Sequence, residues 1–301
     1  MFKKYLFVLY LSIFNFYTLI ANEITSPRFL LIAPGSRPNA MGEAFTAIAD
    51  DNNAIYWNPA GISNLSKKEI SFTHIKGIVY TNMEYLIYVR PVNKIKGTLG
   101  ASIYYMYDSQ ARTNEQGEFE GDFNNNSLVG ILSYGKKIVN VIDIGASLKY
   151  IRWKLDTKIA KGFAIDVGLL KQNLFSKLNV GLSFQNIGLK MKFIEEKFSL
   201  PVVIKLGVGY KLLEDNLILA LDTNHYVNDI TGFNIGAEYV MKKMFFIRCG
   251  YKYFKDIVKL KHLGGISLGV GFGVDGYSLD YAFVPYGELG DMHRISFIIK
   301  F

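Results

Sequence analysis

The sequence predicts an all-β membrane protein: a single closed antiparallel transmembrane β-barrel of about 14 strands. Most of the chain after residue 66 alternates apolar and other residues, as strands with one face on lipid do. Tyr (20), Phe (22) and Gly (28) are abundant, as expected where aromatic girdles flank an apolar band. One N-terminal stretch, residues 33–65, departs from this alternation.

The first 21 residues read as an export signal. Lys3 and Lys4 form a basic start, residues 5–20 are apolar, and Ala21 is a small residue suited to cleavage. A retained membrane helix is the alternative, but about 16 apolar residues are short for a span. No basic stop-transfer cluster follows, and no cysteine lies near the cleavage point. We expect residues 1–21 to be a signal peptide.

Composition excludes several other classes of protein. Cys249 is the only cysteine, so an intramolecular disulfide is impossible and a large core or a closed barrel must supply stability. Beyond the leader, no apolar run approaches the roughly 20 residues of a membrane helix. The formal charge of +8 invites a nucleic-acid interpretation. The lysines are spread through turns and strand ends, so we expect no nucleic-acid partner.

Residues 33–65 predict a short helix followed by a turn. Pro34, Gly35 and Pro38 break the chain, and Asn39 can then cap a helix over about residues 40–49. Its apolar stripe follows helical spacing and consists of Met41, Ala44, Phe45 and Ile48. Asp50, Asp51, Asn52 and Asn53 end the helix. Residues 57–61, the sequence WNPAG, follow as a turn.

This stretch resembles the signature of outer-membrane proteins related to the long-chain fatty acid transporter FadL, and within them it is most similar to PorV/PorQ-type proteins. The matching motif consists of Gly35, Met41, Gly42, Ala44, Phe45, Ala49, Asp50, Asp51, Trp57, Asn58, Pro59, Ala60 and Gly61. The resemblance implies a small helical hatch inside a barrel. We therefore expect a hatch over residues 22–66 and a barrel over residues 67–301.

The strands are predicted from alternation. In residues 265–275, Ile266, Leu268 and Val270 project one way, while small residues project the other. The expected strands are 67–75, 82–92, 96–107, 122–136, 143–155, 162–171, 178–187, 201–213, 216–226, 231–241, 244–254, 265–275, 277–286 and 292–301. Short connections alternate with longer ones, as periplasmic turns and outer loops would. A soluble sandwich is the alternative, but the non-apolar faces suit a crowded lumen better.

The chain ends in an alternating strand whose outward row finishes at Phe301. A terminal phenylalanine on a lipid-facing row resembles the recognition signal of the barrel-assembly machinery. In residues 143–155 the alternation is interrupted, because Tyr150 and Ile151 are adjacent and Trp153 changes parity. A β-bulge there would re-aim the side chains. The resemblance to FadL-related proteins implies that such an irregularity lets a hydrophobic ligand leave sideways through the barrel wall. The alternative is a simple register shift at the barrel rim.

Nothing in the sequence indicates an enzyme, a cofactor or a metal site. The glycines of residues 271–276 match a dinucleotide pattern, but a strand follows them where a helix would be needed. The four histidines have no metal-ligand spacing. Asp50 and Asp51 are expected to hold the hatch by hydrogen bonds. The charges expected in the lumen are Glu84, Arg90, Asp166, Lys205, Asp222, Glu238, Arg248, Asp280 and Arg294.

Two functions remain open. The first is transport of hydrophobic small molecules, such as fatty acids, with Met41, Phe45, Ile55 and Trp57 lining an apolar cavity. The second is a PorV-type scaffold that receives exported proteins for a secretion system. Either protein would lie in the outer membrane of a diderm bacterium and contact its lipid. The apolar loop residues that would bind ligand or protein are Phe119, Phe123, Phe193, Ile194, Phe198 and Leu200.

Overall fold

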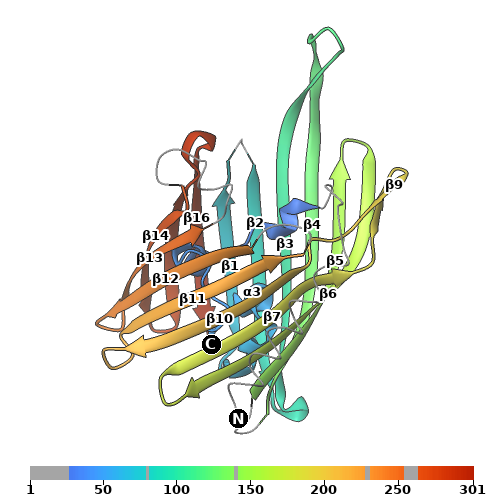
Figure 1. Cartoon of the computed structure of the whole chain (residues 1–301). Coiled ribbons are helices and arrows are strands. Elements are labelled where there is room, and N and C mark those ends of the chain that lie inside the picture. The colour runs from blue at the N-terminus through green and yellow to red at the C-terminus, as the bar shows by residue number, and fades with distance from the viewer. Residues whose placement is uncertain (1–26, 79–80, 139–141, 228–230, 254–263) are drawn as a thin grey trace.

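A computed structural model describes residues 27–78, 81–138, 142–227, 231–253 and 264–301 (Figure 1). The signal peptide expected at residues 1–21 lies outside these ranges, so it stays a prediction. Within the described residues, no helix combines the length and the apolar character needed to cross a membrane.

The described chain forms a closed antiparallel β-barrel, in which β1 pairs with both β2 and β16. Neighbouring strands follow the order β1-β16-β15-β14-β13-β12-β11-β10-β7-β6-β5-β4-β3-β2 (Figure 1). Their bounds are β1 Glu69–Lys76, β2 Asn82–Val92, β3 Gly97–Thr113, β4 Phe119–Ile138, β5 Ile142–Leu155, β6 Lys158–Leu174, β7 Leu178–Gly188, β10 Val203–Leu212, β11 Leu217–Tyr226, β12 Thr231–Met241, β13 Phe245–Tyr253, β14 Ile266–Val274, β15 Tyr277–Pro285 and β16 Asp291–Lys300. The predicted barrel and its strand number are confirmed.

The wall has an apolar outside and a mostly small or polar inside. On β14, Leu268 and Val270 are exposed, whereas Ser267 is buried against the interior. On β16, Ile295 and Phe297 are likewise exposed and Arg294 is buried. Exposed apolar rows around a closed barrel match a lipid environment, because closure satisfies the backbone hydrogen bonds that lipid cannot.

The two ends of the barrel differ in their connections. Tight turns join β10 to β11, β12 to β13 and β14 to β15 at the end where the chain enters β1 and leaves β16. Helix η4 (Asn93–Ile95) lies in the β2–β3 connection at this short-turn end, and η6 (Gly287–Leu289) in a connection at the opposite, long-loop end. At the long-loop end the β3–β4 hairpin rises far above the rest of the barrel (Figure 1).

The connection expected at residues 188–200 contains a hairpin that the sequence did not predict. Strands β8 (Met191–Phe193) and β9 (Glu196–Phe198) pair with each other in a separate two-stranded sheet beside the barrel rim (Figure 1). Each strand spans only three residues. Such short segments contain too little alternation to be read from the sequence.

The β-bulge predicted in residues 143–155 is wrong. The pairing of β5 with both β4 and β6 is continuous through Tyr150, Ile151 and Trp153. The alternation fails because inward positions here are apolar too. A register shift instead lies between β6 and β7, where Asn186 has a left-handed backbone (φ 61°) and its amide donates to Asp166 Oδ1 at 2.8 Å.

Seven of the nine charges expected in the lumen are buried there, and two are not. Arg90 is exposed, and the Glu84 side chain is 29% exposed on the outward row of β2. Glu84 Oε1 and His74 Nδ1 form a hydrogen bond of 2.8 Å near the long-loop rim. The prediction failed because both faces of β2 are apolar, which removes the parity signal.

The hatch (residues 27–66) occupies the lumen with four short helices. They are the 3-10 helix η2 (Arg28–Leu31), α2 (Ser36–Ala40), α3 (Ala54–Trp57) and the 3-10 helix η3 (Pro59–Asn64). Proline at the start of η3 fits its position, because the first helical amides have no intrahelical acceptor.

The helix expected over residues 40–49 does not form. Helix α2 ends at Ala40, and Gly42 and Glu43 follow with left-handed backbones (φ 62° and 66°), which stop a right-handed helix. Asn39 is also not an N-cap acceptor. Its Nδ2 donates to the carbonyl oxygens of Ala33, Pro34 and Gly35 at 3.0, 3.2 and 2.7 Å.

Candidate functional site

Arg37 of α2 joins the hatch to itself and to the barrel wall. Its Nη1 contacts Asp50 Oδ1 at 2.5 Å and Asp51 Oδ2 at 2.9 Å. Its Nε and Nη2 form a two-pronged pair with the Glu238 carboxylate on β12, both at 2.8 Å. Burial lowers the pKa of Arg37, but Asp50, Glu238 and Asp51 outweigh it and raise the pKa above its ordinary value.

The same network extends around the wall. Arg248 on β13 contacts Glu238 Oε2 and, on β15, Asp280 Oδ1, both at 2.5 Å. All three wall side chains are almost fully buried. The structure thus places Asp50 and Asp51 in ion pairs with Arg37 that are also hydrogen bonds, the kind of contact that the sequence led us to expect.

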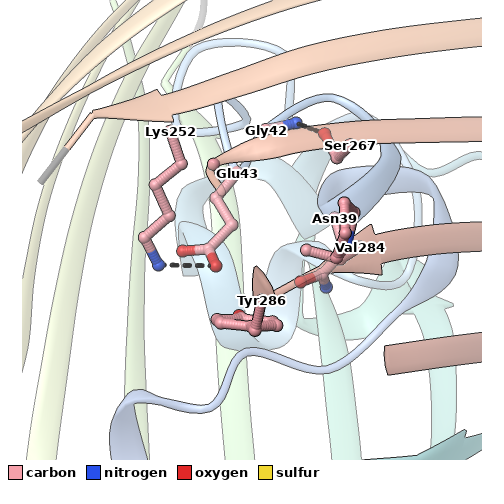
Figure 2. A pocket seen from close by; sticks show the side chains of 9 residues that line it. Asn39, Gly42, Glu43, Lys252, Ser267, Val284 and Tyr286 are labelled. Carbon is pink, nitrogen blue, oxygen red and sulfur yellow. Dashed lines mark hydrogen bonds and ion pairs between the residues drawn. The ribbon is translucent and has the colours of Figure 1, made fainter. Parts of the chain in front are cut away.

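Wall side chains also hold hatch amides that a longer helix would have used. Asp222 Oδ2 on β11 accepts from the amides of Phe45 and Thr46 at 3.0 and 2.8 Å. Ser267 Oγ on β14 accepts from the amide of Gly42 at 2.9 Å (Figure 2). Because the wall supplies these acceptors, residues 42–46 remain hydrogen-bonded without helical structure.

The segment of residues 57–61 is held from several sides. Asn58 Oδ1 accepts from the Ala60 amide at 3.2 Å, and Asn58 Nδ2 donates to the carbonyl oxygens of Thr46 and Leu169 at 2.9 and 3.1 Å. Gln185 Nε2 on β7 donates to the Trp57 carbonyl oxygen at 3.0 Å. The expected turn is therefore an N-capped 3-10 helix whose cap also binds the wall.

Wall glycines let the hatch backbone lie directly on the barrel. A methyl group at Gly250 of β13 would collide with the backbone of Met41 and Gly42. A methyl group at Gly145 of β5 would collide with the backbone of Pro59 and Ala60. Contact this close leaves no room for solvent between hatch and wall at these points.

The four residues expected to line a cavity are instead packed. Met41, Phe45, Ile55 and Trp57 are fully buried. The Phe45 and Trp57 rings meet edge to face with centroids 6.1 Å apart. Lys205 Nζ on β10 lies 4.3 Å from the centre of the Trp57 ring, a cation–π contact. None of the four borders the cavities described below.

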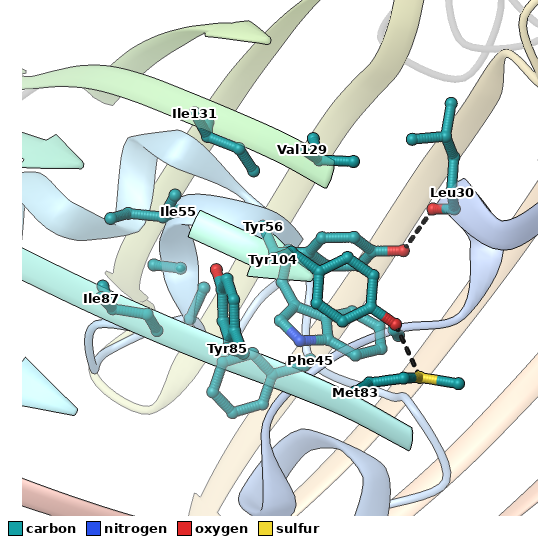
Figure 3. Close-up of a cluster of buried hydrophobic side chains, with 14 of the residues drawn as sticks. Leu30, Phe45, Ile55, Tyr56, Met83, Tyr85, Ile87, Tyr104, Val129 and Ile131 are labelled. Carbon is teal, nitrogen blue, oxygen red and sulfur yellow. Dashed lines mark hydrogen bonds between the residues drawn. The ribbon is translucent and has the colours of Figure 1, made fainter. Parts of the chain in front are cut away.

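Beside the hatch, one side of the lumen is apolar (Figure 3). We call this set the apolar lumen cluster. Its wall residues are Ile75, Met83, Tyr85, Ile87, Tyr104, Met106, Val129, Ile131 and Ile151, and Leu30, Ile55 and Tyr56 pack on it from the hatch. The Tyr56 hydroxyl donates to the Leu30 carbonyl oxygen at 2.8 Å, so hatch segments close over one another (Figure 3).

Sequence reasoning missed the apolar lumen cluster. The available signal was in β2, where Met83, Tyr85 and Ile87 alternate with outward Leu86 and Tyr88, so both faces are apolar. Such a continuous apolar run indicates a strand that is buried on both faces or that has lipid on one face and apolar packing on the other.

Aromatic side chains cover this cluster near the long-loop end. Trp153 on β5 lies 6.0 Å from Phe29, 5.1 Å from Phe193 and 5.9 Å from Phe198, measured between ring centres. The six apolar loop residues named in the sequence analysis differ in their exposure. Phe119 and Ile194 are exposed, Phe123 and Phe193 are half-buried, and Phe198 and Leu200 are buried.

Two cavities whose linings lie in the described residues border the hatch. One of about 710 Å³ opens at the short-turn end and is lined by charged groups that include Arg37, Glu238 and Lys300. The other holds only about 10 Å³, beside the Glu43–Lys252 ion pair of 2.6 Å (Figure 2). No group of three or more His, Cys, Asp or Glu in the described ranges could hold a metal ion.

Known proteins resemble this chain in fold more closely than in sequence. A family model described as "Uncharacterised protein family (UPF0164)" matches residues 20–152. No curated protein matches the chain. Among solved structures, the Pseudomonas putida toluene transporter TodX has a TM-score of 0.59 at 13% identity, covering 87% of this chain and 96% of its own. The CymD monoaromatic hydrocarbon channel has a TM-score of 0.61 at 14% identity, covering 90% and 98%.

A Pseudomonas aeruginosa FadL homologue has a TM-score of 0.57 at 10% identity, covering 86% of this chain and 96% of its own. The fold is that of the FadL-type barrels. At these identities the likeness establishes the fold of this chain and leaves its activity to separate argument. The similar structures are named as a transporter, a channel and a FadL homologue, and none of them as an enzyme, as the sequence analysis expected for this chain.

Proposed function

We propose that this FadL-type barrel takes up hydrophobic small molecules, of fatty-acid-like character, across the outer membrane. The observation that supports it is the apolar lumen cluster, which places a hydrophobic wall inside the barrel at its long-loop end. A barrel that passed only ions or sugars would gain nothing from such a wall, because apolar lining binds apolar ligands.

The hatch supports selective passage over free diffusion. It is tied to β11, β12 and β14 by Asp222, Glu238 and Ser267, and its backbone lies on wall glycines. A hydrophobic ligand could pass the cluster only by displacing the hatch side chains that pack on it, whereas a small polar solute would find no polar path there. The similar channels named for toluene and monoaromatic hydrocarbons are consistent with this proposal.

The test is to identify what the protein carries when purified. Organic extracts of the purified barrel would be analysed by mass spectrometry, with a porin of similar size purified in parallel to subtract ordinary membrane lipid. We expect a hydrophobic small molecule that is enriched over the porin control. An extract indistinguishable from the control, together with no binding of added fatty acid or toluene, contradicts the proposal.

The PorV-type scaffold is the second candidate, and two observations favour it. Met41, Phe45, Ile55 and Trp57 are fully packed where a ligand was expected. The β3–β4 hairpin also stands well clear of the barrel, where an exported protein could bind (Figure 1). Secretion-system proteins would then be the partners, and the PorV/PorQ resemblance of the hatch motif would reflect that role.

Shortening this hairpin distinguishes the two functions. Replacing residues 109–124 by a two-residue turn connects the paired residues Asp108 and Asn125, so it removes the protruding part and leaves the pairing of β3 and β4 within the barrel. If the protein is a scaffold, export of other proteins falls and ligand binding is unchanged. Normal export from cells with the shortened hairpin contradicts the scaffold function.

A further inference from the structure

A groove on the lipid-facing side of the barrel is apolar and open. It measures about 530 Å³ and lies over β2 to β6. Small residues make it, because Ala101 of β3 and Gly130 of β4 lie between larger outward side chains, and a methyl group added at Gly130 would meet no other atom. Leu132, Tyr150 and Phe163 border the groove, and the centres of the Tyr150 and Phe163 rings are 5.4 Å apart. The groove can therefore hold a hydrocarbon chain.

Two basic side chains lie on the outer face directly beside this groove. Arg152 is two residues beyond Tyr150 on the outward row of β5, and Lys161 is two residues before Phe163 on the outward row of β6. The strand register places Arg152 and Lys161 opposite each other, just as it pairs Tyr150 with Phe163. Both basic residues therefore lie about 7 Å closer to the long-loop end than the two rings.

The protein itself does not compensate these two charges. Like charges directly opposite each other on neighbouring strands are destabilising. Arg152 Nη1 donates to the neutral Asn126 Oδ1 at 3.1 Å, and neither Arg152 nor Lys161 forms an ion pair with a carboxylate among the described residues. Asp156, in the turn between the two strands, pairs instead with Arg112 at 2.7 Å. The basic pair therefore favours a bound anion that contacts both side chains.

The position of this pair along the wall matches the head-group level of a bilayer. From Lys161 toward the short-turn end, the outward row of β6 is apolar as far as Leu169, and the next cation on the row is Lys171. A tilted strand segment of this length spans the roughly 25 Å of the apolar band of an outer-membrane barrel. Arg152 and Lys161 therefore lie at the level of lipid phosphates, and the groove lies beside the hydrocarbon chains.

We propose that this face binds one anionic phospholipid of the outer membrane, with its phosphate on Arg152 and Lys161 and an acyl chain in the groove. Both residue types bind phosphate, arginine through parallel N–H donors and lysine as a point charge. A second copy of this chain, docked here about a two-fold axis, would bring its own basic pair to the same interface, so charge favours the lipid. The site is on the outside of the barrel and does not depend on what the lumen passes.

The test measures lipid binding to the purified protein by native mass spectrometry. Phosphatidylglycerol and phosphatidylcholine with the same acyl chains differ in net charge, and glycerol 3-phosphate supplies a phosphate without a chain. Arg152→Gln and Lys161→Gln, singly and combined, remove the charge, and Gly130→Leu fills the groove. Lys94→Gln is the matched control, because Lys94 is an exposed lysine of η4 at the short-turn end, away from the groove.

We expect the wild type to bind phosphatidylglycerol more tightly than phosphatidylcholine and to bind glycerol 3-phosphate far more weakly than either. Arg152→Gln and Lys161→Gln should each weaken phosphatidylglycerol binding by about fivefold, the usual contribution of one basic side chain at a lipid surface, and leave phosphatidylcholine binding unchanged. Gly130→Leu should weaken the binding of both lipids, because the new side chain occupies the space of the acyl chain. Lys94→Gln should bind as the wild type does.

Several results would overturn the inference. Equal phosphatidylglycerol binding by the wild type and the double variant excludes the head-group contact, and a wild type that binds neither lipid excludes the site. Glycerol 3-phosphate binding as tight as that of phosphatidylglycerol indicates an anion site that uses no acyl chain. A dimer that Gly130→Leu dissociates indicates that a second copy of the chain covers the groove. If Gly130→Leu does not assemble into a barrel, the charge variants and the two lipids decide.

Discussion

At the scale of single residues, buried charge in this lumen falls into two groups. Arg37 and Arg248 are neutralised by four carboxylates of hatch and wall, whereas Nε and Nη1 of Arg294 have no partner among the described residues. Paired charges position the hatch, because truncating one partner leaves the other buried and uncompensated. The neighbours of each buried arginine therefore determine whether its charge is compensated.

Replacing Arg37 by Met should destabilise the protein more than replacing any exposed arginine. Asp50, Asp51 and Glu238 would lose their shared cation, for an expected loss of about 3–5 kcal/mol in unfolding free energy. Arg112→Met is the control, since the Arg112–Asp156 pair is nearly half exposed and should be worth about 1 kcal/mol or less. Urea unfolding in detergent measures both, and equal losses would show that the hatch network is not stabilising.

At the scale of elements, the hatch is shaped by the wall more than by its own helical preference. Its helices are no longer than six residues, and the intervening backbone donates to Asp222 and Ser267. Isolated helices this short are unstable in water. Glycines on the inward rows of the strands complete the contact by letting backbone meet backbone. The hatch therefore depends on the wall for its structure.

Adding one methyl group at the hatch contact should loosen the hatch. In Gly250→Ala the new Cβ meets the backbone of Gly42, and overpacking of this kind costs about 1–3 kcal/mol. Gly130→Ala is the matched control, because a Cβ on Gly130 of β4 meets nothing. Limited proteolysis should cut the hatch of the Gly250 variant sooner than that of the control. Identical digestion of the two would contradict the close contact.

At the scale of the whole molecule, a barrel with an apolar outside surrounds a crowded and partly apolar lumen. The outer face also has a groove of about 530 Å³ over β2 to β6, with Ala101 and Gly130 in its floor. In a bilayer such a surface is covered by lipid chains. The orientation follows from the connections, with short turns at one end and the tall β3–β4 hairpin at the other.

The reactivity of Cys249 tests whether the outer face of β13 lies in lipid. It is exposed near the middle of β13, between the outward side chains of Ile247 and Tyr251. In proteoliposomes we expect a charged, water-soluble maleimide to leave Cys249 unmodified, while a lipid-soluble maleimide labels it. Gln116→Cys in a Cys249→Ser background is the control, since residue 116 is exposed at the tip of the β3–β4 hairpin. Rapid labelling of Cys249 by the charged reagent would place β13 outside the lipid.

The barrel strands were predictable from the sequence because alternation is a local property of the chain. Outward apolar rows such as Leu268 and Val270 are required by the solvent around each strand, whatever its partners. The closing strand with Ile295 and Phe297 was predicted for the same reason. Lumen charges were predicted by parity, which failed at Glu84 and Arg90 where both faces of β2 are apolar.

What only the tertiary structure decided depends on partners far away in the chain. Residues 40–49 have a helical apolar stripe, yet Asp222 and Ser267 take their amides and Gly42 and Glu43 turn left-handed. Met41, Phe45, Ile55 and Trp57 were assigned to a cavity and are packed. That Nε and Nη1 of Arg294 have no partner among the described residues is likewise invisible in the sequence. Local patterns set which face a strand shows to lipid, but contacts inside a lumen form only when the barrel closes around its hatch.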